Sequence, residues 1–184
     1  MAAERATQVL MDEHRGIEKM LTAMEQSLPR LEAGDGSVVP LFEQGVDFLS
    51  HFADQCHHHK EEKVLFPLLA KKGIPVEGGP VGVMLHEHEQ GRGYIRGMKE
   101  AIERYRSGDA SALRDLAAAA GGYIALLRTH IFKEDNVLFQ MADRILSPEE
   151  QGKLIETFDQ VETEVMGVGT HERYHKMLAS LDAE

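Results

Sequence analysis

A chain of 184 residues is long enough for one ordinary domain with a sizeable core, so it does not need disulfides or metal ions in order to fold. With 42% hydrophobic and 28% charged residues, its composition is that of a globular protein and excludes a disordered chain. The formal net charge of -11 makes the nucleic-acid backbone and anionic membrane surfaces unfavourable partners.

Cysteine usage and the amino-terminal residues indicate the cellular compartment. Cys56 is the only cysteine, which excludes an internal disulfide and a cysteine-based zinc site. The opening MAAERATQVLMDEHR carries charges where a signal peptide needs an apolar stretch, and the longest uncharged run, LAAAAGGYIALL, is shorter than the ~18 to 20 residues of a membrane span. We therefore expect a soluble cytoplasmic protein with no membrane partner.

The spacing of apolar residues predicts helices and almost no strands, because these residues recur at intervals of three and four. Taken along the chain, the predicted helices span residues 5–31, 38–72, 80–107 and 109–145. Asp109 is the expected N-cap of the fourth helix. The segments EAGDGS and KGIPVEGGP, rich in glycine, end the first and second helices.

A further helix is predicted to follow this set of four. Ser147 is placed to cap it, with Pro148 at the first helical position and Glu150 completing a capping box. The helix breaks near MGVGT, and Thr170 can cap a short final helix. We predict an all-α fold, an up-down antiparallel four-helix bundle over residues 1–146, with a C-terminal helical extension, residues 147–184, packed on the same domain.

Two motifs repeat along the chain at almost the same spacing. HHHKEEKVLF begins at His57 and HIFKEDNVLF at His130, an offset of 73 residues. LMDEHRG around His14 matches MLHEHEQ around His88 at an offset of 74. The simplest interpretation is a duplicated helical hairpin whose halves face each other about a pseudo-twofold axis. Each half then supplies one histidine from its first helix and a His-x-x-x-Glu pair from its second.

This arrangement favours a metal site in the bundle interior. Residues four apart on an α-helix differ by only ~40° around the axis, so each His-x-x-x-Glu pair projects an imidazole and a carboxylate from one face. A single His-x-x-x-Glu motif is commonly two exposed side chains joined by a hydrogen bond. That interpretation does not explain two copies at one offset, accompanied by two further histidines at nearly the same offset. Imidazole with carboxylate suits iron and related metals. The candidate ligands are His14, His57, Glu61, His88, His130 and Glu134.

These motifs resemble the hemerythrin-like, or HHE cation-binding, family. The resemblance rests on DEH, HHHKEEKVLFP, HEHE and HIFKEDNVLF and covers residues 12–141. It implies a di-iron centre without haem inside a four-helix bundle, bridged by two carboxylates and by an oxo or hydroxo group. The histidines would be terminal ligands, with Glu61 and Glu134 as bridges. Ferritin-like bundles use Glu-x-x-His instead, which argues against that alternative.

The sequence departs from the oxygen-carrying members of the family. They have two histidines four apart on the third helix, whereas Met84 stands four residues before His88. They also place the second bridging carboxylate five residues after its histidine, which is Asp135 here. We favour Glu134, because the repeat aligns it with Glu61.

Other histidines remain candidates for the missing ligand or for supporting contacts. His58 could supply the ligand in one half, since its counterpart in the other half is Ile131. His86 lies about 200° around the helix from His88, so both face the centre only in a distorted helix. His171, in the terminal helix, is a further candidate if that helix covers the bundle.

The resemblance leads to three functional hypotheses. The first is a di-iron protein that binds or senses oxygen or a related small molecule, such as peroxide or nitric oxide. The second is an enzyme that disproportionates hydrogen peroxide or reduces nitric oxide at the same centre. The third is an iron storage or delivery protein, or a helical interaction protein. The sequence distinguishes neither iron from manganese nor a monomer from an oligomer.

Overall fold

The computed structural model describes residues 5–167 and 170–181, and within these ranges the side chains of residues 166, 170, 171 and 175 are not described. The described chain is helical and contains no strand. Its first half contains α1 (Ala6–Glu32), a 3-10 turn (Gly36–Val38), α2 (Val39–Phe48), two π-helical segments (Leu49–His58 and Lys60–Leu65) and α3 (Phe66–Lys71). Its second half contains α4 (Pro80–Arg106), α5 (Ala112–Lys133), a π-helical segment (Glu134–Leu138) and α6 (Phe139–Ile145). The remainder contains α7 (Pro148–Val161), a π-helical segment (Glu162–Met166) and α8 (Thr170–Leu181).

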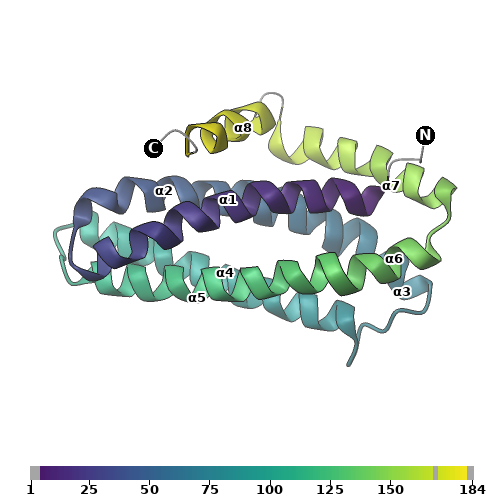
Figure 1. Cartoon of the computed structure of the whole chain (residues 1–184), viewed down its shortest axis with the longest axis horizontal. Helices are drawn as coiled ribbons and strands as arrows, with labels where there is room; N and C mark the ends of the chain where they lie inside the picture. The colour runs from purple at the N-terminus through teal and green to yellow at the C-terminus, as the bar shows by residue number, and fades with distance from the viewer. Residues whose placement is uncertain (1–4, 168–169, 182–184) are drawn as a thin grey trace.

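Four long helical columns form the bundle, as the sequence predicted, and Figure 1 shows how they are arranged. α2 and α3, with the π-helical segments between them, form the second column, and α5 continues through its π-helical segment into α6 as the fourth. α1 packs against α2 and α5, and α4 packs against α2 and α5, which closes the ring. α7 and α8 lie on the outer side of α1 (Figure 1).

Helix boundaries follow local capping chemistry, with one correction. The capping box at the start of α7 is present, because the Ser147 hydroxyl accepts from the Glu150 N–H and the Glu150 carboxylate accepts from the Ser147 N–H. The expected N-cap role of Asp109 is wrong. Its carboxylate accepts hydrogen bonds from the backbone N–H and the hydroxyl of Ser111 in a turn, and α5 begins only at Ala112.

Both His-x-x-x-Glu motifs lie in or beside π-helical backbone, a distortion that the sequence did not predict. The first motif spans the segments 49–58 and 60–65, and Glu134 begins the segment 134–138. Backbone hydrogen bonds in π-helix run from residue i to i+5, so each turn is wider than in an α-helix. Such turns occur mostly as local bulges and frequently at functional sites. In the first of these segments the adjacent residues His57 and His58 are both buried.

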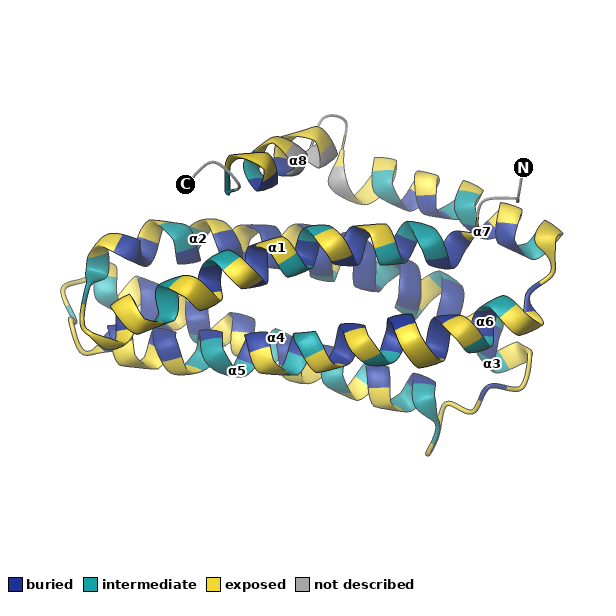
Figure 2. Cartoon of the chain, viewed as in Figure 1, coloured by how far each residue is buried: buried dark blue, intermediate teal, exposed yellow. Residues whose placement is uncertain are grey.

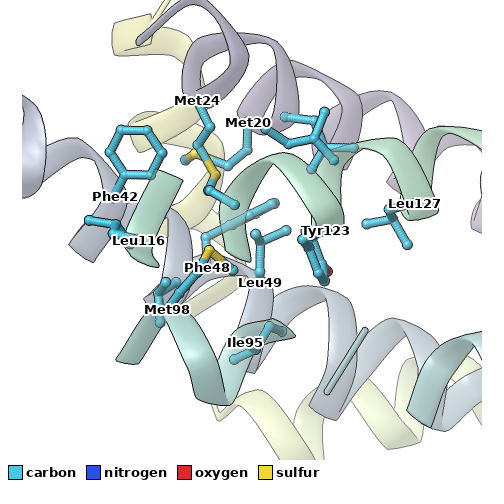
Figure 3. Close-up of a cluster of buried hydrophobic side chains, with 14 of the residues drawn as sticks. Met20, Met24, Phe42, Phe48, Leu49, Ile95, Met98, Leu116, Tyr123 and Leu127 are labelled. Atoms are coloured by element: carbon cyan, nitrogen blue, oxygen red, sulfur yellow. The ribbon is translucent and has the colours of Figure 1, made fainter. Parts of the chain in front are cut away.

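The interior contains two hydrophobic clusters with polar residues between them. The larger cluster fills the end of the bundle that includes Met20, Met24, Phe42 and Leu116 (Figure 3). The smaller cluster, which includes Phe158 of α7, fills the opposite end. Figure 2 shows that the buried residues line the faces of the helices that meet inside the bundle. Among the described residues, no helix combines the length and hydropathy needed to cross a membrane.

Candidate metal centre

Two adjoining groups of buried side chains lie between the hydrophobic clusters. In each group the possible ligand atoms all lie within 4.8 Å of one another. The first group consists of His58, Glu61, His88 and His130, and the second of His14, His57, Glu61 and Glu134. The structure therefore brings together all six candidate ligands from the repeat and adds His58. All seven side chains are buried, with 5% or less of each residue exposed.

The two glutamates lie where the groups meet. One oxygen of Glu61 is 3.5 Å from His57 Nε2 and the other is 3.5 Å from His88 Nε2. Glu134 Oε2 is 3.2 Å from both His14 Nε2 and His130 Nε2. Each carboxylate thus faces one imidazole from each half of the bundle, and Glu61 belongs to both groups whereas Glu134 belongs to the second.

Each of the five imidazoles in the two groups has a carboxylate at its outer nitrogen. Three of the Nδ1–oxygen distances are 2.7 Å: His57 to Glu13, His14 to Asp135, and His88 to Glu62. The other two are 2.9 Å, from His130 to Glu87, and 3.3 Å, from His58 to Asp54. An ionised carboxylate only accepts hydrogen bonds, so Nδ1 donates and the second nitrogen, Nε2, is directed inward. Histidines that bind metals are commonly oriented in this way.

The inner carboxylate oxygens lack the hydrogen bonds that buried polar groups normally have. None of the four carboxylate oxygens of Glu61 and Glu134 has a hydrogen-bond partner among the described residues. A buried ionised carboxylate without a partner is strongly unfavourable unless a cation compensates it. The Nε2 atoms of His14 and His57 are 2.9 Å apart, and those of His88 and His130 are 3.1 Å apart. Ligands at right angles around an ion at about 2.1 Å lie about 3 Å apart, so these residues fit a metal ion.

The electrostatics of the groups show how charge is balanced when no metal is bound. Burial opposes protonation of His57, but the charge of Glu61 and the hydrogen bond to Glu13 outweigh it and raise the pKa of His57 to about 10. The pKa of His130 is raised to about 10 against burial, chiefly by Glu134. Protons on these imidazoles thus compensate the buried carboxylates. A metal ion would displace such protons, and its binding would therefore release them.

His58 has the opposite electrostatic environment. Burial, followed by the nearby positive charges of His88 and His57, lowers its pKa well below the usual value of 6.5. Its ring stacks on that of His88 with centroids 3.8 Å apart. A neutral imidazole in this position needs no deprotonation before it can bind a metal ion.

The other sequence candidates lie in different places. Asp135 is in neither group, because its carboxylate accepts from His14 Nδ1 and also pairs with Arg15. His86 is exposed and is in neither group. The side chain of His171 lies outside the described residues.

Of the five carboxylates that orient the histidines, sequence reasoning named only Asp135, as a possible ligand or supporting contact, and missed Glu13, Asp54, Glu62 and Glu87. The signal was present in the repeat, since Glu13 precedes His14 as Glu87 precedes His88. Each of these glutamates contacts a histidine of the neighbouring helix instead of the one beside it in sequence. The pairing therefore depends on the bundle and could not be assigned from one helix alone.

Comparison with known proteins identifies the family. The model of the hemerythrin HHE cation-binding domain matches residues 5–142, three quarters of the chain. The chain belongs to this family. Both His-x-x-x-Glu motifs lie within the matched residues.

The relatives of this hemerythrin-like protein carry little functional information. It is 27% identical to uncharacterized proteins of Mycobacterium tuberculosis and Mycobacterium bovis over 157 residues, which are 85% of this chain and 61% of each relative. It is 34% identical over 90 residues to the iron-sulfur cluster repair protein YtfE of Musicola paradisiaca, which covers 48% of this chain and 40% of that protein. The chain thus spans about three fifths of the mycobacterial relatives. No solved structure matches it at a significant level.

The carboxylates at the outer nitrogens lead to a first prediction. Replacing Glu62 by alanine removes the acceptor that orients His88, so we expect metal affinity to fall about 10- to 100-fold. Titration of metal-free protein with ferrous iron under nitrogen measures the change. Glu89→Ala is the matched control, because Glu89 also pairs with Arg92 but is exposed and is not the carboxylate at any of the five Nδ1 atoms. Equal losses in the two variants would contradict a specific role for Glu62.

Proposed function

We propose that this protein holds two iron ions between His58, His88 and His130 on one side and His14 and His57 on the other, with Glu61 and Glu134 as bridges. At this centre it binds or senses oxygen, nitric oxide or peroxide. The observation that carries the proposal is the set of four buried carboxylate oxygens for which the described part of the chain provides no hydrogen bond. They face five imidazoles that carboxylates hold from outside. Imidazole with carboxylate is a donor set that iron accepts.

The number of ligands favours a centre that can take up a small molecule. Five imidazoles and two carboxylates are too few to fill the coordination positions of two ions, so positions remain for an external ligand. When bound, a pair of iron ions supplies electrons that a small oxidant can accept. In the proposed centre His58 supplies the fifth imidazole. The third helix does not provide it, because Met84 stands where the oxygen-carrying members of the family have a histidine.

The protein's own side chains would keep water away from the centre. The ring of Phe139 stacks on His14 with centroids 5.6 Å apart, and the ring of Phe66 stacks on His88 at 6.0 Å. Both phenylalanines are 2% exposed or less and belong to the smaller hydrophobic cluster. An apolar wall of this kind limits solvent access and so influences the redox potential of a metal site.

A second candidate function is the removal of nitric oxide or peroxide by the same centre. Similarity to a protein named for iron-sulfur cluster repair, over about half of this chain, supports a role in iron handling. Iron storage or delivery is a third. We place the protein in the cytoplasm, where Cys56, buried and free, stays reduced.

Spectroscopy of the iron-loaded protein distinguishes these functions. We expect ferrous protein to develop a visible absorption band with stoichiometric oxygen or nitric oxide, and to lose it when the gas is removed. Sustained oxygen release from excess hydrogen peroxide, absent in Glu61→Ala, would instead favour the enzymatic reading. A spectrum that does not respond to any of the three molecules would contradict the proposed function.

A further inference from the structure

Two lysines occupy equivalent positions in the repeat. Each contacts a glutamate that in turn contacts a histidine of the centre. Lys60 Nζ donates to Glu13 Oε1 at 2.5 Å, and Glu13 Oε2 accepts from His57 Nδ1 at 2.7 Å. We call Lys60, Glu13 and His57 the Lys60 triad. In the other half Lys133 donates to Glu87, which accepts from His130 Nδ1 at 2.9 Å. These three residues form the Lys133 triad.

The two triads differ in their exposure to solvent. The side chain of Lys60 is completely buried, whereas 32% of the Lys133 side chain is exposed. A lysine is almost never fully buried unless charged or aromatic partners surround it. The repeat does not explain why the ammonium group of Lys60 is buried, because Lys133 has the same local sequence context and is partly exposed. The cause must lie in a part of the chain outside the repeat.

The C-terminal segment that follows the bundle encloses Lys60. α7 packs against the π-helical segment 60–65 and against α1, on the outer side of the bundle (Figure 1). It places the ring of Phe158 with its centroid 5.9 Å from Lys60 Nζ. The segment that continues α7 brings Glu162 Oε2 to 3.4 Å from the same nitrogen. An aromatic face and a second carboxylate thus meet the buried ammonium group.

We propose that α7 and the segment that continues it, residues 148–166, influence the redox potential of the metal centre on the side of His57. Phe158 and Glu162 enclose the buried Lys60 side chain, and Lys60 with Glu13 fixes the orientation of His57. Lys60 and Glu162 are positioning residues in this scheme, because they act through Glu13 and touch neither ion. A buried charge is screened far less than a charge in contact with solvent, so Lys60 influences the centre more than Lys133 does. This inference rests on the proposed iron centre.

Paired lysine substitutions test the proposal. Lys60→Met and Lys133→Met remove the same charge from equivalent positions, and a redox titration of each iron-loaded protein gives its midpoint potential. Loss of a buried positive charge favours the oxidised centre, so we expect Lys60→Met to lower the midpoint potential. The shift should be clearly larger than that of Lys133→Met, because the buried charge is screened less.

A third variant is expected to shift the midpoint potential in the opposite direction. Glu162→Gln removes a negative charge from the same chain of contacts, so it should raise the midpoint potential. The Glu162 side chain is 29% exposed, so this variant remains informative if Lys60→Met does not fold. A merely structural role would not move the potential in opposite directions for the two substitutions.

Iron-free protein gives an independent readout. If Lys60 anchors the C-terminal segment, amide hydrogen exchange in residues 158–166 should be faster in Lys60→Met than in the wild type and unchanged in Lys133→Met. Equal shifts in potential for the two lysine variants, or shifts of one sign for Lys60→Met and Glu162→Gln, would overturn the proposal. A wild-type protein that takes up no iron would instead overturn the proposed function on which it rests.

Discussion

Replacing Glu61 by leucine is expected to reduce bound iron from about two ions per chain to one or fewer, without unfolding the metal-free protein. Glu61 is completely buried, and its two oxygens face His57 and His88 from different groups. Removing this carboxylate deprives both ions of a shared ligand. Glu61 also faces His57, and removing one partner of a buried charge pair costs about 3–5 kcal/mol, so the metal-free variant should melt at a lower temperature than the metal-free wild type while remaining folded. Iron analysis and thermal unfolding of the metal-free variant measure the two effects.

Glu18→Leu is the matched control for this substitution. Glu18 follows His14 by four residues, as Glu61 follows His57, but it lies in neither group and pairs with Arg15. We expect this control to keep its iron. A Glu61→Leu protein that retains two ions would show that the carboxylate is not a bridge. Equal loss of iron from the Glu61→Leu and Glu18→Leu proteins would contradict a specific role for Glu61 in binding the metal.

Removing the metal is expected to lower the melting temperature of the wild-type protein substantially. A ligand that binds only the folded state stabilises it by about 4.1 kcal/mol at a free concentration 1,000 times its dissociation constant. For a chain of this size, about 1 kcal/mol shifts the melting temperature by roughly 2–4 °C. Iron should therefore raise the melting temperature by roughly 8–16 °C. Calorimetry before and after anaerobic chelation measures this difference.

The Glu61→Leu variant again supplies the control. Its melting temperature should respond to iron far less than that of the wild type, because the bridging ligand is absent. If iron leaves the wild-type melting temperature unchanged, the buried carboxylates are not compensated by a bound cation. In that case the protons on His57 and His130 would be their permanent counter-charges.

The helical columns could be predicted well because their apolar spacing and end signals are local. The capping box at Ser147 formed as its sequence indicated. The start of α5 was misplaced, because Asp109 and Ser111 both suit a cap and the chain uses Asp109 in a turn instead. The π-helical turns could not be predicted, because nothing in side-chain periodicity specifies a shift from i+4 to i+5 hydrogen bonding.

The candidate site was predictable to the extent that the repeat is symmetric. The offset between the two His-x-x-x-Glu motifs selected six side chains that the structure brings together, and their role as metal ligands stays a prediction. His58 has no counterpart in the second half, so symmetry could not select it. Symmetry also concealed the difference between Lys60 and Lys133, which arises only because α7 packs over one half of the bundle.

Metal analysis of protein purified without a polyhistidine tag, together with its visible spectrum, tests the central claim most directly. The proposed centre predicts about two iron ions per chain and a charge-transfer band that changes when oxygen, nitric oxide or peroxide is added. A folded, colourless protein that takes up no iron, with His14, His57, Glu61, His88, His130 and Glu134 all intact, would contradict it.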